Sequence, residues 1–304
     1  MGMMDGKAVL VTGAGRGVGR GIALEMAKAG ASVVVNDLGV SLSGEIESDG
    51  SPAEKVVAEI LALGGRAVAN HDSVAEWEGA QAMVKSSIDH FGQIDAVVNN
   101  AGNLRDMYFH KMGPDDFAAV LAVHLQGSFN TSRAAAPFFK EQSSGCYAHM
   151  TSTTGLIGNF GQANYAAAKL GIVGLSKSIA LDMQRFGVRS NAVAPFAWTR
   201  MIDSIPTDTP EQQKRVDGLK KLVPEKIAPF IVALTSDAGA QVTGQIFGVR
   251  NNEIYLFSQP RPINTAHAPE GWTPEAVAER VFDQFADDFY PLHRSADVFT
   301  WDPI

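Results

Sequence analysis

Residues 9–30, VLVTGAGRGVGRGIALEMAKAG, join a short apolar run to a helical pattern through closely spaced glycines. Ile22, Met26 and Ala29 recur at helical spacing, and the acidic residue Asp37 ends the next apolar run. A strand, a glycine turn, a helix and an acidic residue in this order are typical of a dinucleotide-binding unit. Glycines let the backbone approach a pyrophosphate closely, and the free N–H groups of the helix N-terminus favour its negative charge. A plain glycine-rich turn is the alternative, which this context disfavours.

Short β-branched runs alternate with longer helical patterns from residue 8 to about residue 250. The predicted strands span residues 8–12, 32–37, 67–71, 96–100, 146–152, 189–194 and 244–249. Strands that are apolar on both faces and alternate with helices indicate a parallel sheet between two helix layers. The sequence therefore predicts an α/β fold with a doubly wound parallel sheet. We assign residues 1–249 to one dinucleotide-binding and catalytic domain.

Residues 250–304 differ in character and form a C-terminal extension. A polar turn at Asn251 and Asn252 leads into a strand and a Pro-rich connector. A helix then follows, with Thr273 as N-cap and Pro274 at its first position. One face of this helix is apolar and carries Val277, Val281, Phe282, Phe285 and Phe289. We expect an arm that packs on its own domain or on a neighbouring subunit, and a lid over the substrate is the alternative.

The net charge and the residue composition of the chain restrict the kinds of molecule that it is expected to bind. The formal net charge of −8, the isoelectric point near 5.4 and the lack of a basic run argue against nucleic acid or an anionic membrane surface. A small-molecule substrate is expected instead, and no run reaches the roughly 18 apolar residues of a membrane span. The single cysteine, Cys146, indicates a buried small residue and a reducing, cytoplasmic setting. The histidines other than His124 show no paired ligand spacing, so no metal site is predicted.

Asp37 bears on which nicotinamide dinucleotide the glycine turn binds. A carboxylate accepts hydrogen bonds from the adenosine ribose hydroxyls and repels an added 2′-phosphate, which favours NAD. Arg16, inside the turn, can pair with such a phosphate, so NADP is the less favoured alternative. Asp72, after the third predicted strand, is placed to bind the adenine amino group, and a helix N-cap beside Ser73 is an equal alternative.

In QANYAAAKLG, residues 162–171, Tyr165 and Lys169 are four residues apart on a predicted helix and share one face. Ser152 ends the fifth predicted strand, where side chains point into the ligand crevice of a doubly wound sheet. A secondary alcohol loses a hydride to a nicotinamide and a proton to a base, but a phenol has an ordinary pKa of about 10. An ammonium about 4 Å away contributes roughly 4 kcal/mol, which would lower that pKa by up to about 3 units. We therefore predict Tyr165 as the base, Lys169 as its electrostatic support and Ser152 as the substrate anchor.

Together TGAGRGVG, NNAG, Ser152 and YAAAK resemble the short-chain dehydrogenase/reductase family over about residues 5–250. The resemblance implies a Rossmann-type sheet of about seven strands and hydride transfer. It also implies a homodimer or homotetramer built on two long helices, here roughly residues 115–141 and 162–186. The predicted cofactor-binding residues are Gly13, Arg16, Gly17, Val18, Gly19, Asp37, Asp72, Ser73, Asn99, Ala101, Gly102, Tyr165, Lys169 and Thr199.

A narrower resemblance concerns the substrate. VVVNDLG, NNAGNLRDM, VHLQGSF and GNFGQANYAAAKLG are similar to a branch of this family, the (3R)-hydroxyacyl-CoA dehydrogenase parts of peroxisomal multifunctional enzymes of type 2. This implies NAD-dependent oxidation of a 3-hydroxyacyl-CoA, including one with a bulky or steroid-like chain. The alternatives are an NADPH-linked 3-oxoacyl reductase, a hydroxysteroid dehydrogenase, or a dinucleotide-binding scaffold without turnover.

The sequence departs from the family pattern at two positions. His124 stands where most members have an Asn that helps to hold a water in a proton relay, and Phe196 follows Pro195 where a Gly is usual. Residues 103–107, 153–160 and 200–222 are predicted to line the substrate pocket. Within them, Arg105 and Asp106 are interpreted as pocket rim or, equally, as a local ion pair.

Overall fold

The computed structural model describes residues 2–39, 51–197, 209, 213, 217 and 222–303. Within them lies one sheet in the order β3-β2-β1-β4-β5-β6-β7-β8, parallel throughout except for the antiparallel pair β7 and β8. The strands are β1 (Ala8–Val11), β2 (Ser32–Asn36), β3 (Arg66–Asn70), β4 (Ala96–Asn99), β5 (Gly145–Met150), β6 (Val188–Phe196), β7 (Ile246–Arg250) and β8 (Glu253–Leu256). The predicted doubly wound sheet is confirmed, and the C-terminal extension adds its last strand.

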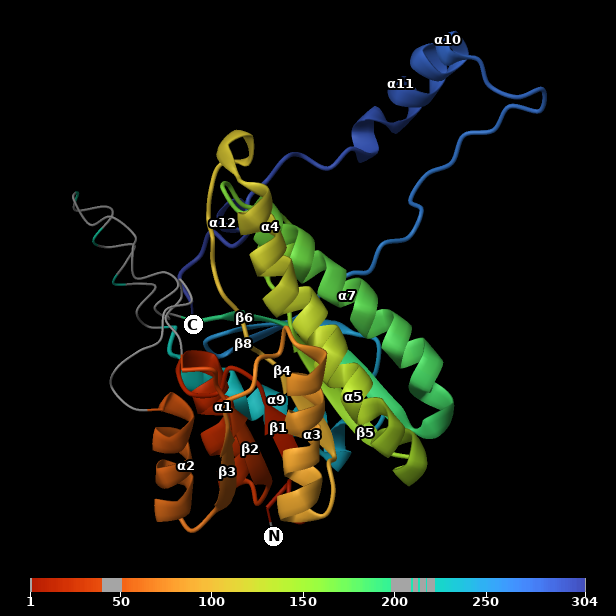
Figure 1. The fold of residues 1–304 in the computed structure, drawn as a ribbon. Helices are drawn as coiled ribbons and strands as arrows, with labels where there is room; N and C mark the ends of the chain where they lie inside the picture. The colour runs from red at the N-terminus through yellow and green to blue at the C-terminus, as the bar shows by residue number, and fades with distance from the viewer. Residues whose placement is uncertain are drawn as a thin grey trace.

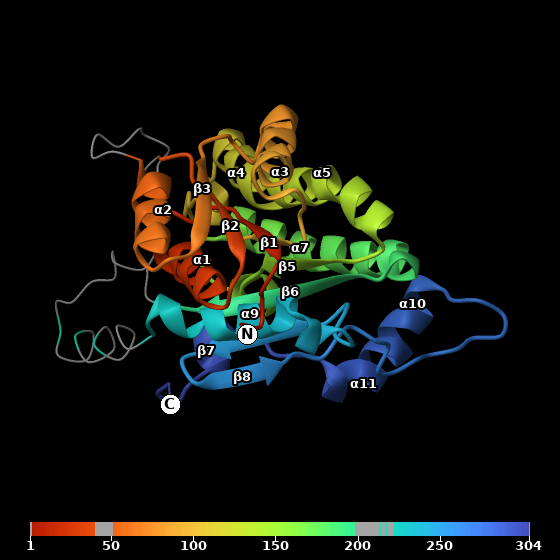
Figure 2. The same cartoon turned by 90° about the horizontal axis from the view of Figure 1, so that it is seen from below.

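Helices cover both faces of the sheet (Figure 1). One layer holds α1 (Gly17–Lys28), α2 (Pro52–Ala62) and α9 (Ala228–Thr235), and the other holds α3 (Trp77–Phe91), α4 (Pro114–Leu121), α5 (Gly127–Gln142) and α7 (Ala163–Met183), as Figure 2 shows. A π-helical turn (Ala122–Gln126) joins α4 to α5, so the long helical stretch predicted for residues 115–141 is confirmed. Among the described residues, no helix combines the length and apolar surface needed to cross a bilayer.

The remaining helical segments are short. They are Phe109–Lys111, α6 (Thr153–Leu156), Gln184–Phe186, Pro224–Lys226, Asp237–Gly239, α10 (Pro274–Ala276), Val277–Val281, α11 (Phe282–Phe285), Ala286–Asp288 and α12 (Ser295–Val298). Ser152 caps α6 by accepting a hydrogen bond from the backbone N–H of Thr154 at 3.1 Å. This cap lies directly after β5, which sets the position of Ser152 at the strand end.

The central strands bury both of their faces. In β1, Val9 and Val11 pack in the core on the α1 side, whereas Leu10 packs on the opposite side. Leu10 is in register with Val34 of β2 and Val97 of β4, so one apolar row crosses the sheet. Because successive side chains of a strand point to opposite faces, helices on both sides require continuous apolar runs. This is why the central strands were predictable from such runs.

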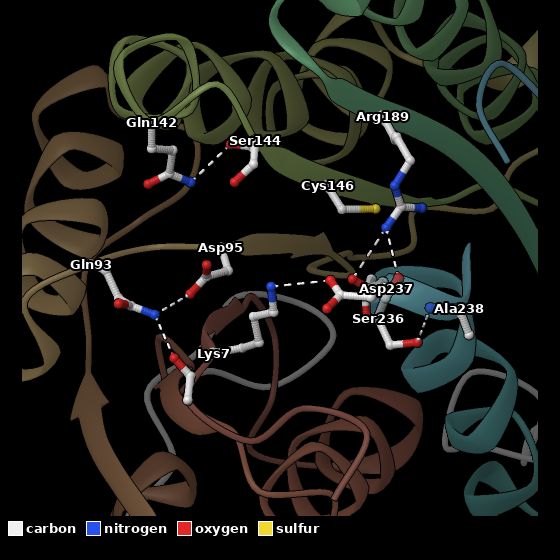
Figure 3. Close-up of polar contacts among 12 residues, drawn as sticks. Lys7, Gln93, Asp95, Gln142, Ser144, Cys146, Arg189, Ser236, Asp237 and Ala238 are labelled. Atoms are coloured by element: carbon white, nitrogen blue, oxygen red, sulfur yellow. Dashed lines mark hydrogen bonds and ion pairs between the residues drawn. The ribbon is translucent and has the colours of Figure 1, made fainter. Parts of the chain in front are cut away.

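The edge of the sheet formed by the amino ends of the strands is closed by paired polar side chains (Figure 3). Arg189, at the start of β6, donates to the carbonyl oxygens of Leu234 and Ser236 near the end of α9, at 2.6 and 3.0 Å. Cys146 lies beside Arg189 and is a buried free thiol, as predicted. Burial raises the pKa of this thiol to about 11, so it is protonated and unreactive at neutral pH.

After β8 the C-terminal extension leaves the body of the molecule as an arm (Figures 1 and 2). Thr273 caps α10 by accepting a hydrogen bond from the backbone N–H of Ala276, and Pro274 follows it, as predicted. The predicted helix is interrupted, because a π-helical turn separates α10 from α11. Phe282 and Phe289, which we expected to pack, are 57% and 60% exposed.

The chain returns to the body at α12. Ser295 donates its backbone N–H to the carbonyl oxygen of Gly158 at 2.9 Å. The ring of Phe299 packs edge-on against those of Phe196 and Tyr255, with centroids 4.8 and 5.3 Å apart. β8 and the segment from α12 onward therefore contact the body of the same chain, whereas Phe282 and Phe289 in the arm between them stay exposed. Contact of the arm with a neighbouring subunit stays a prediction.

Candidate active site

A cleft of about 660 Å³ opens where the carboxyl ends of β1, β2, β4 and β5 meet. β1 lies between β2 and β4, and such a reversal of strand order is where doubly wound sheets bind ligands. The cleft is lined by most of the predicted site, namely Gly13, Arg16, Gly17, Val18, Gly19, Asp37, Asp72, Ser73, Ala101, Gly102, Ser152, Tyr165 and Lys169. Thr199 and most of the segment 200–222 lie outside the described residues.

The glycine turn after β1 is shaped for close backbone approach. Gly13 has a φ of +61°, and a Cβ at this position would lie 2.7 Å from the Cα of Ala101. A Cβ on Gly19 would lie 2.3 Å from the carbonyl oxygen of Gly13. Both contacts are too close for any larger residue, so the turn and α1 pack as only glycine allows. The first N–H groups of α1 therefore face the cleft, where they fit a pyrophosphate.

The Asp37 carboxylate is held at the end of β2 by two backbone amides. Its Oδ2 accepts from the N–H of Gly15 and its Oδ1 accepts from the N–H of Gly39, both at 2.9 Å. Each carboxylate oxygen has a second acceptor position, so both can still receive a ribose hydroxyl. The glycine turn and its acidic partner are thus one preformed unit, as their order in the sequence indicated.

Asp72 and Ser73 line the cleft after β3. Asp72 accepts a hydrogen bond from the side chain of Asn70 at 2.6 Å, and the Ser73 hydroxyl accepts one from the N–H of Ala75 at 3.2 Å. The helix-cap alternative for Asp72 is wrong, because α3 begins at Trp77, four residues beyond Ser73.

The two asparagines of NNAG point to opposite sides of β4. Asn100, which we did not predict, lines the cleft and donates to the carbonyl oxygens of Thr12 and Gly13, both at 3.0 Å. Asn99, which we predicted, is buried on the α5 side and donates to the hydroxyl of Ser132 at 2.9 Å. Adjacent residues of a strand face opposite ways, so only one of the pair can reach the cleft. The structure therefore brings the side chain of Asn100, and not that of Asn99, to the cleft, and cofactor binding by either residue stays a prediction.

The cleft brings Ser152, Tyr165 and Lys169 together from the end of β5 and from α7. A hydrogen bond links the side chains of Tyr165 and Ser152. The Lys169 ammonium lies 5.5 Å from the centroid of the Tyr165 ring and donates to the carbonyl oxygen of Met150 at 2.6 Å. One helical turn of α7 thus carries both the phenol and the ammonium into the cleft that Ser152 also lines, and their roles stay predictions.

The protonation equilibria of this trio differ from our expectation. Burial raises the pKa of Tyr165 to about 12, the hydrogen bond from Ser152 opposes this shift, and the charge of Asp106 adds to it. Burial also lowers the pKa of Lys169 to about 7, so its ammonium is only partly charged at neutral pH. The predicted depression of the Tyr165 pKa is therefore wrong for this structure. The physical reason is that desolvation acts against both charged forms at once.

Residues 7–209 match the short chain dehydrogenase family. The chain belongs to the short-chain dehydrogenase family. It is 49% identical to a short-chain type dehydrogenase/reductase of Mycobacterium tuberculosis, over 76% of this chain and 78% of that protein. It is 42% identical to peroxisomal multifunctional enzyme type 2 of Mus musculus over 90% of this chain, which spans only 36% of the mouse enzyme. A 3-oxoacyl-[acyl-carrier-protein] reductase of Synechocystis is 38% identical over 81% of this chain and 96% of that reductase.

Two solved structures share this short-chain dehydrogenase fold. A short chain dehydrogenase from Mycobacterium avium has a TM-score of 0.83 at 38% identity, with 95% of this chain and 98% of that chain covered. A 7α-hydroxysteroid dehydrogenase in complex with NADH and 7-oxo glycochenodeoxycholic acid has a TM-score of 0.73 at 31% identity, with 82% and 94% covered. The family of this chain is therefore shown by sequence and by structure. Members of this family use a nicotinamide dinucleotide as cofactor, and this chain is an oxidoreductase.

The rim of the dehydrogenase cleft is formed by two loops that hold each other. The Gln162 side chain donates to the Asp106 carboxylate at 2.8 Å and accepts from the Asn159 side chain at 2.9 Å. Gln162 and Asn159 line the cleft, whereas Asp106 does not, and partial desolvation raises the pKa of its carboxyl group. Arg105 pairs with Asp116 at 3.2 Å, so the alternative of a local pair with Asp106 is wrong. In the described part of the chain, no group of acidic, histidine or cysteine side chains could hold a metal ion.

Proposed function

We propose that this short-chain dehydrogenase oxidises the 3-hydroxyl group of a 3-hydroxyacyl-CoA, with NAD as hydride acceptor. The observation that carries the proposal is the meeting of Ser152, Tyr165 and Lys169 in the cleft that also contains the glycine turn and Asp37. A scaffold that only binds a dinucleotide would not need a phenol, an ammonium and a hydroxyl converging on one point. The convergence therefore favours turnover over binding alone.

Each side chain has a distinct task in this reaction. Ser152 donates a hydrogen bond to the substrate oxygen and orients it toward Tyr165, whose phenolate takes the hydroxyl proton. Lys169 places a positive charge beside the phenolate and is within the same cleft wall, where it can bind ribose hydroxyls. A bound NAD would supply the hydride acceptor, and the positive charge of its nicotinamide ring would add to that of Lys169. The two charges act against the desolvation that raises the Tyr165 pKa to about 12.

For the cofactor, the geometry at the end of β2 supports NAD. Asp37 lines the cleft there with both carboxylate oxygens held by backbone amides, so a 2′-phosphate bound beside it would meet a fixed negative charge. Arg16 lines the same part of the cleft and is the feature that favours NADP. Fluorescence titration with NADH and with NADPH decides between them, since tighter binding of NADPH would refute this choice.

For the substrate, support comes from relatives. The similarity to a 3-oxoacyl-[acyl-carrier-protein] reductase and to the multifunctional enzymes points to a thioester whose third carbon carries the oxygen. A panel of (3R)- and (3S)-hydroxyacyl-CoA esters and hydroxysteroids, assayed for NAD reduction, tests this. Oxidation of a hydroxysteroid alone, or reduction of a 3-oxoacyl thioester with NADPH alone, would replace the proposal by one of those activities.

For the C-terminal extension, we propose an oligomer arm rather than a lid. α10 and α11 lie away from the sheet (Figure 1), they contribute no residue to the lining of the cleft, and Phe282, Phe289 and Tyr290 are 57%, 60% and 87% exposed. Many short-chain dehydrogenases are dimers or tetramers, and a second copy would cover these rings. Sedimentation of the full chain and of the Phe282→Ser/Phe289→Ser variant tests the proposal. If the variant has the same molecular mass in solution as the parent protein, the proposal is refuted.

We place the protein in the cytoplasm, where the free Cys146 thiol stays reduced.

A further inference from the structure

Thr151, directly after β5 and before Ser152, lines the cleft with a side chain for which we predicted no role. The residue is 1% exposed, and its backbone N–H donates to the carbonyl oxygen of Val193 in β6 at 2.8 Å. The sheet therefore fixes the backbone from which the hydroxyl extends. Burying a hydroxyl is unfavourable unless it is hydrogen-bonded, so the partner that it finds is informative.

The partner of the Thr151 hydroxyl is the backbone of Lys169, whose carbonyl oxygen accepts from it at 2.7 Å. Lys169 lies inside α7, where each interior carbonyl oxygen already accepts from the N–H four residues further along. The helix does not need a second donor there to satisfy its backbone. The bond instead joins α7 to the end of β5, one residue before Ser152.

The ammonium of Lys169 is held by the same strand end. It donates to the carbonyl oxygen of Met150 at 2.6 Å, so the consecutive residues Met150 and Thr151 bind both ends of one lysine. A lysine side chain is a flexible four-carbon stem, and its charge has a defined position only when both ends are fixed. The two contacts together therefore define where the ammonium lies.

The backbones of α6 and α7 also meet at Lys169. A Cβ on Gly155 would lie 2.9 Å from the Cβ of Lys169 and 2.7 Å from the backbone nitrogen of Leu170. α6 follows Ser152 directly, so it is fixed to the end of β5. Tyr165 lies about one helical turn before Lys169. A displacement of α7 would therefore move the phenol and the ammonium together relative to Ser152.

We propose that Thr151 is a positioning residue of the active site, whose hydroxyl holds Lys169 and Tyr165 of α7 in register with Ser152. The inference adds a residue to the proposed dehydrogenase function and rests on it. In this role Thr151 exchanges no proton with the substrate. Its effect is geometric, and a displacement of about 1 Å at a catalytic group costs up to roughly a hundredfold in rate.

Two variants of Thr151 test this role. Thr151→Val keeps the shape of the side chain and loses the hydroxyl, whereas Thr151→Ser keeps the hydroxyl. We expect Thr151→Val to lower kcat about tenfold, because α7 loses its hydrogen bond to the end of β5. The substrate contact of Ser152 remains, so KM should change little. Thr151→Ser should keep most of the parental kcat.

Thr235→Val is the matched control. The Thr235 hydroxyl is also buried and donates to a helix carbonyl oxygen, that of Ile231 at 2.8 Å, but it lines no part of the described cleft. Both Val variants should lose a similar amount of thermal stability, and only Thr151→Val should lose kcat per folded molecule. An equal loss of kcat in both, a parental kcat in Thr151→Val, or a Thr151→Ser enzyme as slow as Thr151→Val would overturn the inference.

A second measurement does not depend on turnover. Fluorescence titration with NADH or NADPH, whichever binds more tightly, reports on Lys169, which lies in the wall of the cleft where it can bind ribose hydroxyls. The affinity should fall in Thr151→Val and stay parental in Thr151→Ser and Thr235→Val. If no substrate of the panel is oxidised but this pattern is found, the proposed substrate fails and the role of Thr151 stands. Equal affinities in the parent and all three variants would overturn that role.

Discussion

The polar side chains at the amino edge of the sheet are paired, whereas those at the carboxyl edge have shifted pKa values or lack a partner among the described residues. At the amino edge, Arg189 donates to backbone carbonyl oxygens and Lys7 forms an ion pair of 3.1 Å with a surface carboxylate (Figure 3). At the carboxyl edge, Tyr165 is partly buried and Lys169 is buried, both with shifted pKa values, and among the described residues Nδ1 of His124 has no hydrogen-bond partner. Paired polar groups stabilise a fold, whereas buried groups held for chemistry destabilise it. The difference teaches that substitutions at the amino edge should change stability and those at the carboxyl edge should change rate.

The largest effect is expected for Tyr165→Phe, which removes one hydroxyl from the carboxyl edge. Turnover should fall about a thousandfold, within the range that a general base contributes, while NADH affinity and the melting temperature change little. Steady-state rates, fluorescence titration and thermal unfolding check this. Tyr108→Phe is the control, because its side chain is 61% exposed and should change none of the three. A Tyr165→Phe enzyme with undiminished activity would break the comparison.

Lys169→Met should lower turnover about a hundredfold, because the hydrogen bonds of a charged donor contribute roughly 1.5–3 kcal/mol each. NADH affinity should fall as well. The carbonyl oxygen of Met150 loses its donor, but removing the desolvated ammonium offsets this cost, so turnover should change more than the free energy of unfolding. Lys177→Met on the same helix controls for a general effect on α7, and comparable losses in the two variants would contradict the assignment.

At the amino edge, Arg189→Met should have the opposite signature. The carbonyl oxygens of Leu234 and Ser236 lose their donor, so the free energy of unfolding should decrease by about 2–3 kcal/mol. The rate per folded molecule should be unchanged. Urea unfolding and turnover measure the two quantities, with Arg185→Met as control, since that exposed guanidinium packs only on the ring of Phe186. An Arg189→Met protein that turns over more slowly but is as stable as the parent would contradict the expected difference between the two edges.

Asp37→Asn should shift coenzyme preference. Removing the charge relieves the repulsion of a 2′-phosphate, which at about 4 Å in a water-like medium is on the order of 1 kcal/mol, or about fivefold in relative affinity for NADPH. One amide oxygen remains to accept from Gly15 or Gly39. The ratio of NADPH to NADH dissociation constants is the readout. An equal change in Asp72→Asn would show that the effect is not specific to the ribose side.

The smallest effect is expected for Asp106→Asn. The Asp106 carboxylate raises the pKa of Tyr165, so its loss should lower that pKa. The active form is the phenolate, and the rate rises with pH, so the pH of half-maximal rate should move downward by about half a unit. The amide oxygen can still accept from Gln162, which preserves the rim. Asp116→Asn, which loses its partner Arg105, should leave the profile in place.

Much of the fold could be predicted because its signals are local. The strand positions follow from apolar runs, the Thr273 cap follows from its residue type, and the four-residue spacing of Tyr165 and Lys169 places them on one face wherever the helix lies. The tertiary contacts were harder to predict from the sequence. Asn99 and Asn100 are chemically identical and adjacent, and only the position of the sheet decides which one faces the cleft.

The sequence by itself determined the family, the sheet, the glycine turn with Asp37, and the proposed catalytic trio, since each depends on residue type and spacing along a few turns or strands. Only the tertiary structure decided that the arm stands clear of the body, that Nδ1 of His124 has no hydrogen-bond partner among the described residues, and that burial raises the pKa of Tyr165. These depend on how much water is excluded around a group. That quantity is set by everything packed against it, including residues more than twenty positions away in the chain, such as Asn103 for His124.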